Sequence, residues 1–120
     1  MRSNVNQIKI IGMGMSKKSL PSAYLWMITN ADILVGGQRH LNQFDSYHCK
    51  KKVINKDLPK LVSYLKDHSK TNKIVVLASG DPLFFGIGGY LIKALGPENI
   101  EVFPNISTVA AAFAKIKEPW

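Results

Sequence analysis

Apolar residues along the chain form short continuous runs separated by segments with helical spacing. The runs at 7–12, 32–36, 52–54, 73–79 and 99–103 predict strands. The run from Ile74 to Ala78 is apolar throughout, which is typical of a strand covered on both faces, so we expect it in the centre of a sheet. Helices are predicted over 21–31, 37–44, 57–68, 83–95 and 107–116.

Local signals support the helix starting points. Asp57 is a good N-cap and Pro59 follows in the first turn, ahead of an apolar stripe that includes Leu61 and Leu65. Ser107 offers a hydroxyl cap to the last helix. The regular alternation of strand and helix predicts an α/β fold with a doubly wound, mostly parallel five-stranded sheet and helices on both faces. In such sheets the ligand site lies beyond the carboxyl ends of the strands.

Length and charge narrow the class of protein. The chain has 120 residues, the size of one domain, and 16 Lys and Arg against 8 Asp and Glu give a net charge of +8. An excess of this size attracts anions, either nucleic acid or a small molecule with several carboxylates or phosphates. A plainer interpretation is a solvated helix surface for Lys56, Lys60, Lys66 and Lys70 and a loop or strand edge for 50–52.

Several classes of protein and of binding site are excluded or disfavoured. Cys49 is the only cysteine, so neither an internal disulfide nor a CxxC zinc site forms, and we predict no metal site. No apolar run approaches the roughly 20 residues of a membrane span, and the first residues lack the pattern of an export signal, so we expect the cytoplasm. His40, His48 and His68 have no metal-ligand spacing and are expected at the surface.

The turns that follow predicted strands carry the candidate chemistry. Gly12 and Gly14 begin a dinucleotide fingerprint, but its third glycine is replaced by Lys17. The segment 80–89 lacks the Gly-Lys-Ser/Thr end of a phosphate-binding P-loop. Asp81 has two interpretations that the residues leave open: a helix N-cap followed by proline, or a carboxylate that lines a ligand cleft.

Four motifs in order carry a family resemblance. They are IIGMG at 10–14, VGGQRHL at 35–41, GDPLFFGIG at 80–88 and PNISTV at 104–109, with PW at 119–120. Together they resemble the tetrapyrrole methylase family over 7–120. Within that family, the segments 35–41 and 80–88 look like the branch of precorrin-6Y and cobalt-precorrin-7 methyltransferases of cobalamin biosynthesis.

The resemblance implies methyl transfer from S-adenosyl-L-methionine to a carbon of a corrin precursor, at position 5 and in some relatives also at 15. It implies a polycarboxylate tetrapyrrole substrate, which agrees with the positive charge. We assign no catalytic residue, because an activated methyl donor and an electron-rich carbon need alignment more than a base. Gly14 and Arg39 are expected on the substrate side. The resemblance implies cofactor contacts at Met15, Gly80, Asp81, Phe84, Ser107 and Thr108.

Three departures from the family pattern matter. The first loop reads Gly14-Met15-Ser16 where relatives commonly have Gly-Pro-Gly, and Ala110 stands where glutamine is common. Relatives also continue for about another domain's length. We therefore expect 1–120 to be an amino-terminal tetrapyrrole methylase domain, without the carboxyl-terminal domain that closes the cofactor cleft, and to turn over little by itself. A homodimer and a decarboxylating partner domain or protein are further expectations from the family.

Two alternatives remain. The same fold could methylate ribosomal RNA, although the segment 35–41 argues for the corrin branch. A non-enzymatic nucleic-acid-binding module would use the lysines at 50–52 and bind with strong salt dependence, but aromatic residues are not interleaved with these lysines.

Overall fold

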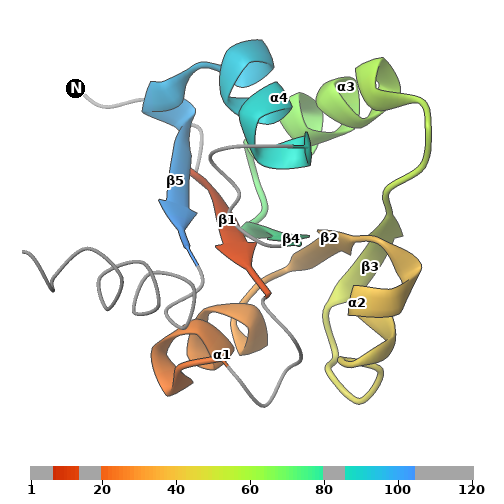
Figure 1. The fold of residues 1–120 in the computed structure, drawn as a ribbon, viewed down its shortest axis with the longest axis vertical. Coiled ribbons are helices and arrows are strands. Elements are labelled where there is room, and N and C mark those ends of the chain that lie inside the picture. Colours follow the sequence, from red (N-terminus) through yellow and green to blue (C-terminus); the bar gives the residue numbers. More distant parts are fainter. Residues whose placement is uncertain (1–6, 14–19, 80–85, 105–120) are drawn as a thin grey trace, which may run out of the picture.

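The computed structural model describes residues 7–13, 20–79 and 86–104 (Figure 1). Strands and helices alternate along this part of the chain, as the sequence predicts. The predicted helix at 107–116 and the first residues of the helix predicted at 83–95 lie outside the described residues. The elements in order are β1 (Ile8–Gly12), α1 (Ser22–Thr29), β2 (Ile33–Gly36), α2 (Gln38–Asn42), β3 (Lys50–Val53), α3 (Leu58–His68), β4 (Ile74–Ala78), α4 (Gly86–Leu95), a 3₁₀ turn (Pro97–Asn99) and β5 (Ile100–Phe103).

The five strands form one sheet in the order β3-β2-β4-β1-β5, and every neighbouring pair is parallel. Strand β4 occupies the centre, and all five of its residues are buried. It pairs with β2 on one side and β1 on the other, with Val76 opposite both Val35 and Ile10. The prediction of a central, fully covered strand is confirmed.

Side chains of the sheet alternate between two apolar cores. Val76 and its same-face neighbours pack with Leu61, Leu65 and Leu91, from α3 and α4. Leu77, on the opposite face, packs in the second cluster with residues of α1 and α2. Figure 1 shows α3 and α4 together on one side of the sheet, and α1 and α2 on the other. Helices therefore cover both faces, as the period of two within each strand requires.

The start of α3 follows its predicted capping signal. The backbone N–H of Lys60 donates to Oδ1 of Asp57 at 3.1 Å, and Pro59 lies in the first turn where its missing N–H costs nothing. The helix begins at Leu58 and buries Leu61 and Leu65. The lysines expected on solvated surfaces, at positions 56, 60, 66 and 70, are all exposed.

Strand β3 differs from its predicted bounds, 52–54, because it is an edge strand rich in lysine rather than apolar residues. It pairs only with β2, and its residues are exposed or half-buried. The ammonium of Lys51 donates to the carbonyl oxygen of Tyr47 at 2.8 Å, and that of Lys52 lies 4.9 Å from the centre of the Tyr64 ring. The strand-edge interpretation of this lysine run is correct, because basic side chains protect an unpaired edge.

Strand β5, at the opposite edge of the sheet from β3, also begins later than predicted. Residues Pro97–Asn99 form a 3₁₀ turn, so β5 begins at Ile100 rather than at Asn99. Gly96 precedes the turn with a φ of 93°, a conformation that favours glycine. None of the helices described at 20–79 and 86–104 is long and apolar enough to span a membrane.

Candidate functional site

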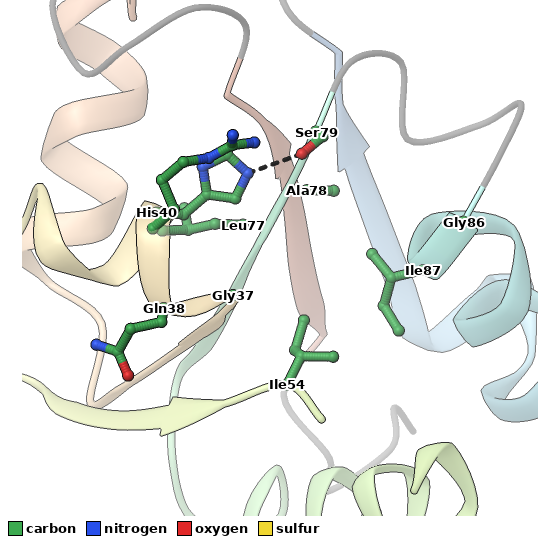
Figure 2. Close-up of a pocket in the computed structure, with 10 residues that line it drawn as sticks. Gly37, Gln38, His40, Ile54, Leu77, Ala78, Ser79, Gly86 and Ile87 are labelled. Atoms are coloured by element: carbon green, nitrogen blue, oxygen red, sulfur yellow. Dashed lines mark hydrogen bonds between the residues drawn. The ribbon is translucent and has the colours of Figure 1, made fainter. Parts of the chain in front are cut away.

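A cavity of about 590 Å³ opens at the carboxyl edge of the sheet (Figure 2). It lies between the turns that follow β2, β3 and β4 and the first turn of α4, which is where the doubly wound topology predicts a ligand site. Its volume falls in the usual range for small-molecule sites. The described residues that line it are Gly37, Gln38, Arg39, His40, Ile54, Leu77, Ala78, Ser79, Gly86 and Ile87.

The last residue of β2, Gly36, and the residue that follows it, Gly37, serve different purposes. A Cβ on Gly36 would lie 3.2 Å from Cβ of Leu77 and 3.7 Å from Cβ of His40, so this glycine lets α2 approach β4 closely. A Cβ on Gly37 would meet nothing within 4 Å. Gly37 is the N-cap of α2 with φ −66° and ψ 158°, an extended conformation open to any residue. Glycine is therefore not needed at position 37 to avoid backbone strain. Its lack of a side chain leaves free space at the cavity.

His40 is buried, and the prediction of a surface histidine at this position is wrong. Its position on the inner side of α2, next to buried Leu41, packs the ring against the sheet and leaves it 9% exposed. Nε2 of the ring lies 2.9 Å from Oγ of Ser79 (Figure 2). Burial lowers the pKa of His40, and the nearby guanidinium of Arg39 lowers it further. The ring is therefore neutral near pH 7.

The other two histidines lie away from this cavity. His48 is exposed, as predicted. His68 is half-buried rather than exposed, because its ring packs on Tyr64 with the ring centres 4.1 Å apart. In the part of the chain that the structure describes, no group of three or more His, Cys, Asp or Glu side chains could hold a metal ion.

Arg39 is exposed and lines the cavity, so it adds a positive charge there. Ser79 is also exposed, at the end of β4. Ile54, Leu77 and Ile87 supply apolar wall. The arrangement combines an apolar surface with a few polar groups, as small-molecule sites commonly do.

Most residues predicted to contact the cofactor or substrate lie outside the described residues. These are Gly14, Met15, Gly80, Asp81, Phe84, Ser107 and Thr108, and their roles stay predictions. Described residues near them in the chain meet at the carboxyl edge: the N–H of Met13 donates to the carbonyl of Ala78 at 2.8 Å. Pro104, three positions before Ser107, accepts a hydrogen bond of 2.7 Å from the hydroxyl of Tyr24.

Sequence reasoning missed His40 and Ser79 as cavity residues. A signal for both was available, since each lies within a few residues of the carboxyl end of a predicted strand. Their contact, however, joins residues 39 positions apart and depends on α2 packing against β4. Only Arg39 among the predicted site residues is described in the structure and lines the cavity.

Comparisons with known proteins agree with this architecture. Residues 7–120 match the family model of tetrapyrrole (corrin/porphyrin) methylases. The chain is 40% identical over 103 residues to the cobalt-precorrin-7 C(5)-methyltransferase of Salmonella typhimurium, covering 85% of this chain and 51% of that protein. The chain spans about half the length of this relative and of the probable cobalt-precorrin-7 C(5)-methyltransferase of Methanocaldococcus jannaschii.

Two solved structures share the fold at low sequence identity. The precorrin-6Y methylase of Archaeoglobus fulgidus superposes with a TM-score of 0.68 at 22% identity, covering 92% of this chain and 58% of that one. The uroporphyrin-III C-methyltransferase of Thermus thermophilus, complexed with S-adenosylhomocysteine, gives a TM-score of 0.69 at 19% identity, with 89% and 51% covered. With the parallel sheet, its cavity and the match over 7–120, the chain belongs to the tetrapyrrole methylase family.

Proposed function

We propose that this chain is the amino-terminal half of an S-adenosylmethionine-dependent methyltransferase of cobalamin biosynthesis. The reaction is C-methylation of a corrin precursor, of the cobalt-precorrin-7 C5 type or the precorrin-6Y C5,15 type. The observation that carries the proposal is the 40% identity to a cobalt-precorrin-7 C(5)-methyltransferase over 85% of the chain. The cavity at the carboxyl edge of the sheet supports it independently.

Two features of the described part of the cavity support the binding of a flat organic ligand. Gly37 leaves open space where another residue would place a Cβ, so a ligand can approach the backbone there. The apolar side chains of Ile54, Leu77 and Ile87 suit flat, weakly polar ligand surfaces. Further cofactor contacts are proposed for Met15, Gly80, Asp81, Phe84, Ser107 and Thr108, on the family resemblance.

S-adenosylmethionine supplies a sulfonium methyl, which is already an activated electrophile. The protein then has to align the methyl donor with the ring carbon and to keep water out, and this can provide much of the rate enhancement. Ile54 and Ile87 contribute apolar side chains to the cavity wall, which favours the exclusion of water (Figure 2). No general base is required from this chain.

The substrate is a tetrapyrrole with several acetate and propionate side chains. The net charge of +8 attracts such an anion over a distance, and Arg39 offers a guanidinium fork to one carboxylate at the cavity. Gly14 is proposed on the same substrate side. The structural role of Lys51 and Lys52 at the edge of β3 reduces the case for a nucleic-acid-binding module built on these lysines.

A second domain completes the site in this proposal. The chain covers 51% of its Salmonella typhimurium relative, so the remaining half of such a protein would form the other wall of the cleft. The 120 residues by themselves should bind the cofactor weakly. We further propose a cytoplasmic enzyme that forms a homodimer and works with a decarboxylating domain or protein; light scattering of the two-domain protein tests the dimer.

The decisive experiment joins this chain to the carboxyl-terminal half of the Salmonella typhimurium relative. The chimera is incubated with methyl-labelled S-adenosylmethionine and either the corrin precursor or ribosomal RNA. Label on the ring carbon supports the proposal. Label in RNA favours the alternative substrate, and a folded chimera that binds no cofactor refutes both.

A single substitution in the chimera tests the cofactor loop. Asp81→Ala should weaken binding of S-adenosylhomocysteine, measured by calorimetry. Asp67→Ala, which removes an exposed carboxylate on α3, is the charge-matched control and should leave binding unchanged. Equal affinity of both variants would leave Asp81 with a helix-capping role only.

A further inference from the structure

Three polar residues line the cavity where α2 faces the end of β4. Nε2 of His40 lies 2.9 Å from Oγ of Ser79, and both residues line the cavity together with Arg39 (Figure 2). Nδ1 of His40 is buried and has no hydrogen-bond partner near it in the described structure. This unpartnered nitrogen limits the tautomer that the ring can adopt.

A neutral imidazole carries hydrogen on one ring nitrogen only. If Nδ1 carried it, a buried N–H donor would lack an acceptor, and such orphaned donors are rarer in proteins than unpaired acceptors. The hydrogen therefore belongs on Nε2, and His40 donates to the hydroxyl oxygen of Ser79. Burial and the guanidinium of Arg39 lower the pKa of His40, which keeps the ring neutral as this assignment requires.

A serine hydroxyl that accepts from His40 keeps its own hydrogen for another partner. Among the described residues, no second partner of the Ser79 hydroxyl is found, and Ser79 is exposed at the cavity. Arg39 adds a positive charge at the same cavity, whose described lining contains no Asp or Glu. A hydroxyl donor and a guanidinium fork lining the same cavity are the donors that a carboxylate requires.

We propose that Arg39 and the hydroxyl of Ser79 form a carboxylate-binding subsite, and that His40 is a positioning residue that directs the Ser79 hydrogen into it. The inference rests on the function proposed above, in which two ligands carry carboxylates. One source is the acidic side chains of the tetrapyrrole, and the other is the methionine carboxylate of the cofactor. The chemistry at the subsite is the same for both, and the binding experiment separates them.

The test uses the ¹⁵N-labelled 120-residue chain and nuclear magnetic resonance, which detects millimolar binding. Uroporphyrin III and S-adenosylhomocysteine are titrated separately. One of them should shift the Arg39 guanidinium and Ser79 amide signals. Ser79→Ala and Arg39→Gln should each weaken that ligand's binding about tenfold or more, as expected for hydrogen bonds to a charged group. Ser79→Thr retains the hydroxyl and should bind like the wild type.

Matched controls test whether the subsite recognises the carboxylate of the ligand. Lys56→Gln removes an exposed charge that does not line the cavity and should leave binding unchanged. If S-adenosylhomocysteine is the ligand, methylthioadenosine, which lacks the carboxylate, should bind equally well to the wild type and Ser79→Ala. If uroporphyrin III is the ligand, S-adenosylhomocysteine should show no dependence on Ser79.

The positioning role of His40 is tested by two further measurements, the protonation of its ring and the affinity of His40 variants for the ligand. Nitrogen shifts of the imidazole should show Nε2 protonated. His40→Gln, which retains an N–H donor, should bind the ligand more tightly than His40→Phe. An Nδ1-protonated ring, unchanged affinity in both Ser79→Ala and Arg39→Gln, or no shift with either ligand overturns the subsite. None of these outcomes decides whether the protein is a methyltransferase. That proposal is tested separately, by methyl transfer in the chimera.

Discussion

The hydroxyl of Tyr24 donates a hydrogen bond of 2.7 Å to the carbonyl oxygen of Pro104, which lies 80 residues further along the chain. The Tyr24 ring also meets Phe103 edge-on, with the ring centres 5.7 Å apart. These contacts hold α1 against the end of β5, at the carboxyl edge of the sheet. Burial raises the pKa of Tyr24, so the phenol remains a donor throughout the neutral range.

Removing this hydroxyl should destabilise the domain. Tyr24→Phe leaves the Pro104 carbonyl without its donor, and we expect the free energy of unfolding to fall by about 1 kcal/mol in urea denaturation. Tyr64→Phe is the matched control, because the Tyr64 hydroxyl is buried without a partner in the described structure. Its removal should be neutral or stabilising. Equal losses in the two variants would contradict the assigned roles.

Gly36 at the end of β2 and the adjacent Gly37 should respond differently to the same substitution. Gly36→Ser places a Cβ against Leu77 and should cost about 1–3 kcal/mol of stability, as overpacking usually does. Gly37→Ser adds a Cβ in open space and a hydroxyl at the N-cap of α2. The melting temperature of this variant should therefore be unchanged or slightly higher. Similar melting temperatures for both variants would show that α2 is not closely packed on β4.

The cap of α3 should be replaceable by another side-chain acceptor. Asp57→Ala removes the acceptor of the Lys60 N–H and should lower the free energy of unfolding by about 1 kcal/mol. Asp57→Asn keeps a carbonyl oxygen at the same position and should retain most of the stability. Urea denaturation of the three proteins makes the comparison. An asparagine variant as unstable as the alanine variant would assign the effect to charge instead.

His40 should make stability depend on pH. Its pKa is lowered in the folded state from the ordinary value of 6.5, so the unfolded chain binds a proton more readily. The free energy of unfolding should therefore fall as the pH drops below about 6.5, by at most about 1.4 kcal/mol per pH unit, until the folded state is also protonated. Denaturation between about pH 5.5 and 7.5 measures this slope.

The matched variants are His40→Gln and His48→Gln. The first removes the titrating ring while keeping a donor for Ser79, and its stability should depend less on pH than that of the wild type. The second replaces an exposed histidine and should retain the wild-type slope. A wild-type slope in His40→Gln would mean that another group controls the acid sensitivity.

The order and type of the elements were predictable because they depend on local pattern. A continuous apolar run identified β4, and the Asp57 and Pro59 signals identified the start of α3. The bounds of the edge strand β3 were predicted less accurately, because three of its four residues are lysines. A strand that pairs on one side only does not need an apolar pattern.

The sequence by itself determined the alternation of strands and helices, the covered central strand and, through its motifs, the family. It also predicted the edge of the sheet at which the cavity opens. Only the tertiary structure decided which residues after different strands face one another. The burial of His40 against Ser79 depends on β2 and β4 being neighbours and on Gly36 allowing α2 to pack closely. Such contacts arise from strand order and packing between residues distant in sequence, and no local pattern encodes them.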